Sequence, residues 1–295
     1  MKLGIIGGSG LYAMEGLTEV HERSLTTPFG LPSDAFVCGR VGACEVVFLP
    51  RHGRGHRLLP AEINHRANIY AFKTLGVDRV VSISAVGSLR EDLRPRDVVL
   101  PDQYYDRTKS SAAHTFFGRG VVAHVSFGDP VCAALSNQVA QAVTAELAAD
   151  KALADRHLHR KGTYVNMEGP AFSTRAESNV YRKLGFDVIG MTSLGEAKLC
   201  REAEICYQAV AMVTDYDCWH DTEGEVSVDM IIGHLMANVA LAKKIIRRLA
   251  ERLPAKRECG CGSALKQAIM TAPAAIPAEA RQRLGVLIDK YLPAP

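Results

Sequence analysis

Seven short runs of mainly apolar residues are spread along this chain, and they constrain its fold more than any other feature. Runs this short that are apolar almost throughout are typical of strands buried on both faces of a sheet. The runs are Leu3–Ile6, Val46–Leu49, Arg79–Ser84, Asp97–Leu100, Thr163–Met167, Asp187–Met191 and Ala209–Val213. The sequence therefore predicts a sheet that is covered on both sides.

Helical patterns separate several of these runs. Pro60 is placed as a first helical residue, Thr174-Arg-Ala-Glu177 fits a capping box, and Gly76 and Gly185 are typical helix stops. The predicted helices are Pro60 to about Leu75, Thr174 to about Leu184, Gly195 to about Glu202, and Val228–Leu253. The alternation of strand and helix predicts an α/β fold: one domain with a mixed, largely parallel β-sheet covered by helices.

Composition excludes several other classes. The 295 residues are 47% hydrophobic and 23% charged, which suits a globular protein with a sizeable core. The net charge of +3 is too balanced to predict binding to nucleic acid or to a membrane surface. No run approaches the roughly 18–20 apolar residues of a membrane span, and Met1–Ile6 is too short for a signal peptide. A cytoplasmic protein is expected.

Pro254 marks the predicted boundary between the domain, residues 1–254, and a C-terminal extension, residues 255–295. The extension is expected to pack on the core through Leu284–Leu292. It carries Cys259-Gly-Cys261, two of eight cysteines. A structural zinc site would need a second pair of ligands, and no partner pair is evident in the sequence. Free thiols, or disulfides from the extension to core positions such as Cys200, remain open.

A glycine loop, Gly7-Gly8-Ser9-Gly10, follows the first apolar run. Gly8–Ala13 also matches the fingerprint G-x-G-x-x-A of dinucleotide-binding loops. Such a loop opens a long helix, whereas the segment that follows contains the turn-rich stretch Thr27–Pro32 and has little room for one. Two interpretations remain: a tight turn between strands, or an anion site formed by backbone N–H groups and the Ser9 hydroxyl.

Hydrogen-bond donors follow three further runs. Arg51 and His52 come directly after Val46–Leu49, where a guanidinium fork and an imidazole can donate to an anion, although a solvated basic loop is the alternative. Ser84 ends one run, and Thr192 follows another. Because ligands of α/β sheets bind beyond the carboxyl ends of strands, these positions predict a site for an anionic or polyhydroxylated ligand.

With these residues assembled, the chain resembles the purine nucleoside phosphorylase superfamily, and within it the methylthioadenosine phosphorylases. The resemblance runs from about residue 3 to residue 250. Its phrases are Gly4-Ile-Ile-Gly-Gly-Ser-Gly-Leu11, Arg51-His-Gly53, Gly87-Ser-Leu-Arg90, Asn166-Met-Glu-Gly-Pro-Ala-Phe-Ser173, Thr174-Arg-Ala-Glu177 and Thr214-Asp-Tyr-Asp-Cys-Trp219. The last phrase is the most specific. One departure is Gly195-Glu196, where the family commonly has Pro-Glu, so a looser helix start is expected.

The resemblance implies a single α/β domain without metal or organic cofactor, in which inorganic phosphate is the co-substrate. The implied phosphate ligands are Ser9, Arg51, His52, Ser84, Ala85 and Thr192. The implied nucleoside ligands are Met191 at the ribose, Phe172, Ser173, Asp215, Tyr216 and Asp217 around the purine, and Val228 at the 5′ substituent. Ser173 and Val228 would set specificity. His124 would reach the site of a neighbouring subunit, which implies a homotrimer or a hexamer.

The implied reaction is phosphorolysis of S-methyl-5′-thioadenosine, in which phosphate displaces adenine from C1′ of the ribose. Asp215 is predicted to donate a proton to nitrogen 7 of the leaving purine. An aspartate also suits the exocyclic amine of a 6-aminopurine, whereas a 6-oxopurine would suit an asparagine better. The alternative is a phosphorylase of 6-oxopurine nucleosides or methylthioinosine. Asp217 could touch the base or only orient the backbone.

Overall fold

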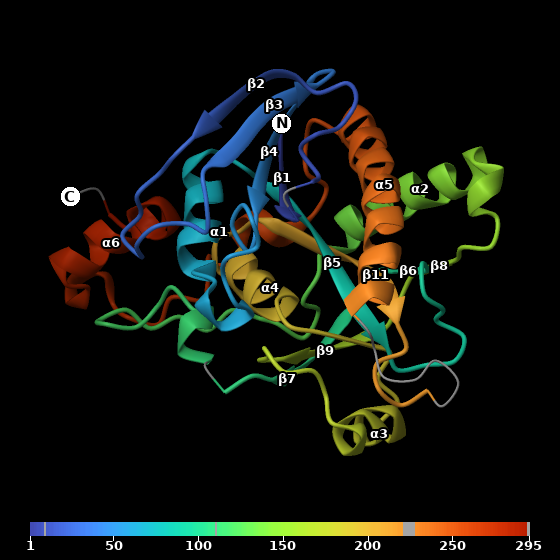
Figure 1. The fold of residues 1–295 in the computed structure, drawn as a ribbon. Helices are drawn as coiled ribbons and strands as arrows, with labels where there is room; N and C mark the ends of the chain where they lie inside the picture. Colours follow the sequence, from blue (N-terminus) through green and yellow to red (C-terminus); the bar gives the residue numbers. More distant parts are fainter. Residues whose placement is uncertain (9, 110, 221–227, 294–295) are drawn as a thin grey trace.

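The computed structural model describes residues 1–8, 10–109, 111–220 and 228–293, and for residues 111–112 and 228–232 only the backbone. A mixed sheet crosses the molecule, with helices on both of its faces (Figure 1). Alternate residues of one strand serve the two sides: Ile5 packs with the helices of one face and Ile6 with those of the other. The predicted α/β fold with a sheet buried on both sides is confirmed.

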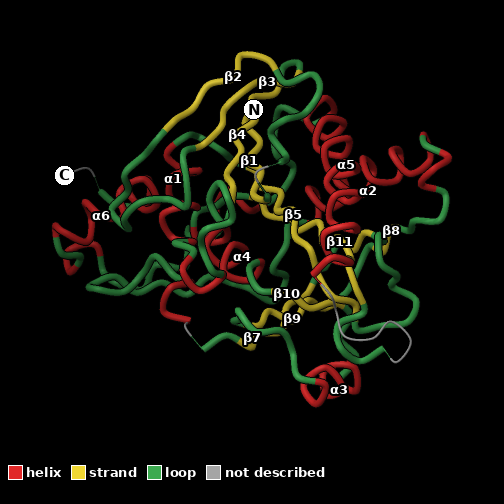
Figure 2. The backbone as a smooth tube through the Cα atoms, viewed as in Figure 1, coloured by secondary structure: helices red, strands yellow, loops and turns green. Residues whose placement is uncertain are grey.

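The sheet is organised around β5 (Figure 2). This strand pairs in parallel with β1 and β11 and, toward its end, antiparallel with β10. The strands are β1 (Lys2–Gly7), β2 (Thr18–Arg23), β3 (Phe36–Val41), β4 (Cys44–Pro50), β5 (Arg79–Ser88), β6 (Val98–Val99), β7 (Gln103–Arg107), β8 (Leu158–His159), β9 (Thr163–Met167), β10 (Val188–Gly190) and β11 (Cys206–Asp215). All seven predicted runs fall on strands. The sequence did not predict β2, β3, β7 or β8.

Two groups of helices cover the sheet. α1 (His65–Thr74), α4 (Ser193–Glu202) and α6 (Ala278–Ile288) pack on one face, and α2 (Ala133–Ala149) and α5 (Val228–Arg252) on the other. α3 (Arg175–Lys183) lies at the edge of the sheet near β9 (Figure 1). No helix among the described residues has both the length and the hydropathy to cross a membrane.

The helix boundaries test the sequence signals. At α3 the capping box is confirmed, because the Thr174 hydroxyl accepts from the Glu177 N–H at 3.2 Å and the Glu177 carboxylate accepts from the Thr174 N–H at 2.9 Å. The predicted start at Pro60 is wrong: Pro60 opens only a 3₁₀ turn, and α1 begins after Asn64, whose side chain accepts from the Ala67 N–H at 3.1 Å. A capping side chain outweighed the proline.

The start of α4 also differs from expectation. The helix begins at Ser193, two residues before Gly195, and its first turn is secured by the Asn166 side chain, which accepts from the Leu194 N–H at 3.0 Å. A Cβ at Gly195 would lie 2.9 Å from the ring of His114. The glycine therefore gives His114 room instead of loosening the helix.

The C-terminal extension packs against the domain through an apolar face and a buried carboxylate. Leu284 and Ile288 of α6 are buried in one cluster with Ile69 of α1. Glu204, which precedes β11, accepts hydrogen bonds from the Leu265 N–H at 3.0 Å and the Tyr291 hydroxyl at 2.5 Å, and pairs with Lys290. Three donors from the extension therefore converge on one buried carboxylate of the domain.

The cysteines of the extension have partners that the sequence did not reveal. The sulfur atoms of Cys259 and Cys261 lie within 4.8 Å of those of Cys132 and Cys206, and all four are free thiols in the structure. A second pair, which was not evident in the sequence, therefore lies beside Cys259 and Cys261. Cys200, the partner considered from the sequence, is buried outside this group.

Candidate active site

Strand β5 brings the two halves of the candidate site together. β10 runs antiparallel to it, with Ile189 opposite Gly87, so the chain that continues from β10 returns along β5 and brings Thr192 level with Ser84. Tyr164 supports this placement, because its side chain interacts with both the Ser84 side chain and the Thr192 backbone. The sequence placed Ser84 at the end of a strand. That is wrong, because β5 continues to Ser88.

The end of β11 lies further along the same strand. β11 runs parallel to β5 and pairs Asp215 with Gly87. A Cβ at Gly87 would lie 3.0 Å from a carboxylate oxygen of Asp215 and 3.3 Å from the Cβ of Asp217, so only glycine allows both acids to approach β5. Gly87 is three residues beyond Ser84, or about 10 Å along a strand. β5 thus carries hydroxyl donors at one point and two carboxyl groups about 10 Å away.

Arg51 is buried beneath the Ser84 end of the site. Its Nε donates to Oε1 of Glu196 at 2.5 Å. Its two terminal nitrogens donate to the Ser82 hydroxyl at 2.5 Å and to the Ile83 carbonyl at 3.2 Å. These bonds use three of the five guanidinium N–H groups. One N–H on each terminal nitrogen remains for a ligand, which is fewer than the free fork that the sequence suggested.

Glu196 is the residue of this site that sequence analysis missed as a functional group. Burial opposes its ionisation, but the charge and the hydrogen bond of Arg51 outweigh burial and lower the pKa of Glu196. Its second oxygen accepts from the Tyr207 hydroxyl at 2.9 Å. The sequence offered one signal, the glutamate of Gly195-Glu196 at a position where the family commonly has Pro-Glu. The ion pair fixes the orientation of Arg51 from below.

His52 is held in one protonation state. Partial burial and the charge of Arg51 lower its pKa to about 4, so the imidazole is neutral near pH 7. Its Nδ1 lies 2.8 Å from the carbonyl oxygen of Leu58. Because a carbonyl only accepts, Nδ1 carries the hydrogen and Nε2 presents a lone pair. In this neutral form the ring offers an acceptor to a ligand, where the sequence predicted a donor, and the role of His52 at an anion stays a prediction.

The hydroxyl end of the site has unused hydrogen-bonding capacity. The Ser84 hydroxyl is buried beside the Tyr164 hydroxyl, and neither has a partner in ordinary hydrogen-bond geometry, while the next residue, Ala85, is exposed between buried neighbours. Thr192 precedes α4, yet its side chain does not cap the helix. The first turn of a helix also carries a partial positive charge. A buried hydroxyl and a helix N-terminus beside an accessible stretch of strand suit an anion.

The two carboxyl groups at Gly87 lie close enough to interact. Asp215 accepts from the Thr214 hydroxyl at 2.7 Å and from the Asp217 N–H at 2.8 Å. Burial raises the pKa of Asp217 to about 6, and the charge of Asp215 adds to the effect. The pair therefore begins to hold a proton close to neutral pH.

The raised pKa of Asp217 predicts how stability depends on pH. The folded-state pKa of Asp217 is above its ordinary value of 3.8, so its stabilising contribution is complete below about pH 4 and is lost as the pH rises to about 6. The loss amounts to about 3 kcal/mol. Asp217→Asn should therefore become more stable than wild type by an increasing margin over this interval. Urea unfolding of both proteins at several pH values measures this margin. A difference in the free energy of unfolding that stays constant with pH would contradict the raised pKa of Asp217.

Other predicted nucleoside ligands lie around the carboxyl pair. Tyr216 directs its hydroxyl to the Glu91 carbonyl at 3.3 Å and packs its ring against Trp219, so it anchors this segment. The Ser173 carbonyl accepts from the Cys218 thiol at 3.2 Å, which ties the loop after β9 to the segment after β11. Met191 lies against the backbone of this loop at Gly169.

The remaining candidates are less connected. The ring of Phe172 is 59% exposed. His124 is exposed, and its backbone N–H donates to the Ala268 carbonyl in the extension at 2.9 Å. Ser9 lies outside the described residues, and of Val228 only the backbone at the start of α5 is described. Their predicted roles stay predictions.

Comparison with known proteins identifies the family. The family model of the phosphorylase superfamily matches residues 2–251. The S-methyl-5′-thioadenosine phosphorylase of Geobacter sulfurreducens is 57% identical over 98% of this chain and 99% of its own length, and that of Koribacter versatilis is 54% identical over 98% and 96%. These alignments include most of the C-terminal extension.

Solved structures agree. A methylthioadenosine phosphorylase from an antarctic soil metagenomic library has a TM-score of 0.90 at 48% identity and covers 97% of this chain and 98% of its own. The methylthioadenosine phosphorylase of Schistosoma mansoni in complex with adenine has a TM-score of 0.84 at 35% identity over 92% and 99%. This chain therefore belongs to the phosphorylase superfamily and, within it, to the S-methyl-5′-thioadenosine phosphorylases.

Proposed function

We propose that this chain cleaves S-methyl-5′-thioadenosine with inorganic phosphate to adenine and 5-methylthioribose 1-phosphate, a pentosyl transfer that needs no organic cofactor. The observation that carries the proposal is the spacing along β5, which separates the donors near Ser84 from the carboxyl pair at Gly87 by about 10 Å. That distance accommodates a ribose between a phosphate and a purine. The methylthio group at the 5′ position is proposed because the relatives are named methylthioadenosine phosphorylases.

Phosphate would be bound at the Ser84 end. The remaining N–H groups of Arg51, the Ser84 hydroxyl and the backbone at Thr192 would donate to its oxygens, together with the Ser9 loop and the strand at Ala85. The lone pair of His52 would accept the hydroxyl of hydrogen phosphate. This arrangement directs the charged oxygens toward C1′. Phosphate then serves as nucleophile and as counter-charge to the oxocarbenium-like transition state.

The purine would lie at the other end. As the bond between C1′ and N9 breaks, its electron pair passes to the purine ring, and a proton from the carboxyl pair neutralises nitrogen 7. Because the two acids interact, either can hold the shared proton. We assign the transfer to Asp215, which contacts Gly87 at the end of β11, and recognition of the exocyclic amine to Asp215 and Asp217 together.

The test is release of adenine from methylthioadenosine with and without phosphate. Release that requires phosphate is expected, and release in its absence would indicate a hydrolase. The same assay with methylthioinosine distinguishes the 6-oxopurine alternative, and a clear preference for methylthioinosine would contradict the assigned role of the aspartates. Replacing the methylthio group by hydroxyl tests the apolar contact predicted for Val228.

We also propose that three subunits assemble so that His124 reaches a neighbouring site. His124 is exposed, and beside it Val122 and Met270 are 49% and 65% exposed and joined by a backbone hydrogen bond of 2.8 Å. Exposed apolar side chains of this kind are typical of subunit contacts. We place this assembly in the cytoplasm.

The trimer makes a prediction for His124→Ala. This variant should lose about tenfold in kcat/KM through substrate binding, the loss of roughly one hydrogen bond, without a change in the fold of the protomer. Light scattering of the wild type measures the assembly, and a fully active monomer would contradict both claims.

A further inference from the structure

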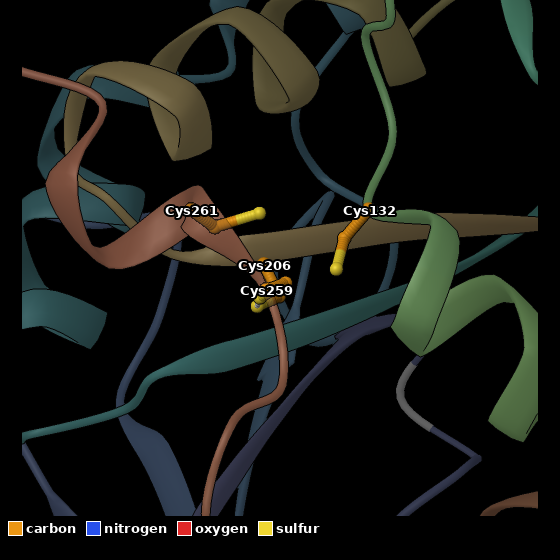
Figure 3. Close-up of side chains that lie close together, drawn as sticks. All are labelled: Cys132, Cys206, Cys259 and Cys261. Carbon is orange, nitrogen blue, oxygen red and sulfur yellow. Dashed lines mark hydrogen bonds between the residues drawn. The ribbon is translucent and has the colours of Figure 1, made fainter.

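Four cysteines from three distant parts of the chain meet at one point (Figure 3). Cys132 immediately precedes α2, Cys206 is the first residue of β11, and Cys259 and Cys261 flank Gly260 in the extension. The four sulfur atoms all lie within 4.8 Å of one another, and the sulfur atoms of Cys206 and Cys259 are 3.3 Å apart. The fold of the chain, and not the sequence spacing, brings the four residues together.

The sulfur spacing fits a tetrahedral metal site. Zinc binds four thiolates at about 2.3 Å, which places neighbouring sulfur atoms about 3.8 Å apart. The Cys206–Cys259 distance of 3.3 Å and the upper limit of 4.8 Å for all pairs lie on either side of that value. A disulfide requires about 2.05 Å between its sulfur atoms, whereas the sulfur atoms of Cys206 and Cys259 are 3.3 Å apart and all four cysteines are free thiols. We propose that Cys132, Cys206, Cys259 and Cys261 bind one structural zinc ion.

The surroundings suit thiolate ligands. The Leu135 N–H of the first turn of α2 donates to the Cys132 sulfur at 3.5 Å, and a helix N-terminus favours a negative charge there. The guanidinium of Arg257 interacts electrostatically with Cys206 and Cys259. It offsets part of the charge of −2 that four thiolates and Zn²⁺ carry. Cys132 and Cys206 are buried while Cys259 and Cys261 are half-buried, so an ion can enter from the side of the extension.

The site would be structural and not catalytic. Its ligand Cys206 begins β11 and Asp215 ends it, which separates them by nine residues or about 30 Å. Four protein ligands also leave no open position for substrate. Zinc would instead join the extension to the domain, beside the contacts that Glu204 makes with Leu265 and Tyr291. The site thus explains why the extension carries Cys259-Gly-Cys261.

The first experiment measures metal in the full-length wild-type protein. The protein is purified with reductant, incubated with zinc alone and desalted, and its metal content is determined by mass spectrometry. One zinc per chain is expected. Exchange for Co²⁺ should give the ligand-field and sulfur-to-cobalt absorption bands of a tetrahedral thiolate site. Zinc well below one per chain after this loading, or a different metal in its place, would overturn the proposal.

Variants locate the ion. Cys259→Ser/Cys261→Ser should lose the zinc and lower the melting temperature, and a chelator should lower that of the wild type to a similar value. Cys38→Ser replaces a buried cysteine of β3 outside the group and is the matched control, expected to retain the zinc. Zinc retained by the double variant would overturn the assignment. If the double variant fails to fold, the cobalt spectrum of the wild type still decides.

Thiol titration of the denatured protein separates zinc from disulfides. Protein prepared without reductant and unfolded with chelator should give eight thiols per chain, because zinc protects cysteines in the thiolate form. Six or four thiols, restored to eight by reductant, would show disulfides and refute the zinc site. Adenine release serves only as a control, because a failure of the proposed function would leave the metal content unaffected.

Discussion

Asp215→Asn is expected to lower kcat/KM for methylthioadenosine by about 10²–10⁴-fold, the usual contribution of a proton donor. An amide cannot supply the proton that neutralises nitrogen 7. Its single oxygen can still accept one of the two bonds that Asp215 accepts, from the Thr214 hydroxyl or from the Asp217 N–H, so the fold should persist. The loss should fall on kcat more than on KM for phosphate, because phosphate would bind about 10 Å away. Steady-state kinetics with both substrates measures this.

Two controls define the role of Asp215. Asp217→Asn removes the neighbouring acid and should cost less, while the activity ratio of methylthioinosine to methylthioadenosine should rise in Asp215→Asn. An amide N–H can donate to the 6-oxo group, which a carboxylate cannot. An unchanged rate with methylthioadenosine in Asp215→Asn would remove this residue from the mechanism. A larger loss of kcat/KM in Asp217→Asn would identify Asp217 as the proton donor instead.

The buried part of the sheet could be predicted from the sequence because its information is local. Runs such as Val46–Leu49 are apolar at every position, and burial on both faces leaves no other solution for so short a segment. β2 could not be predicted in this way. All six residues of Thr18–Arg23 are exposed, and the strand exists because β3 offers an edge with which it can pair. Such pairing depends on tertiary context more than on composition.

In the candidate site, too, local features could be predicted from the sequence and long-range contacts could not. Arg51, Thr192 and Asp215 were found because each follows an apolar run, and the phrases around them resemble a family. The ion pair of Arg51 with Glu196 joins residues 145 positions apart, and only the register of strands and the packing of α4 bring them together. The protonation of His52 depends on the same packing, since it follows from burial and from the charge of Arg51. Sequence patterns carry no signal for such contacts.

Glu196→Gln is expected to destabilise the protein by about 3–5 kcal/mol in buffer without phosphate. The substitution keeps an oxygen for the bond from Arg51 but removes the charge that compensates the cation of Arg51, a residue only 4% exposed. An unpaired buried charge costs this much. If Arg51 faces the phosphate site, an anion can replace the lost partner. Added phosphate should then raise the melting temperature of Glu196→Gln well beyond its effect on the wild type.

Glu202→Gln is the matched control on the same helix. Glu202 is also buried, but burial raises its pKa to about 7, and its oxygens accept from the Phe116 N–H and the Thr115 hydroxyl at 2.7 Å each. Because the Glu202 carboxyl is already partly protonated, and so partly uncharged, near pH 7, its replacement by glutamine should cost only about 1 kcal/mol, the value of one hydrogen bond. Added phosphate should raise the melting temperature of Glu202→Gln by as much as it raises that of the wild type. Thermal unfolding of the three proteins over a phosphate series compares them. Equal shifts of the melting temperature in all three proteins would mean that the charge of Glu196 does not affect anion binding. Arg51 would then have only a structural role.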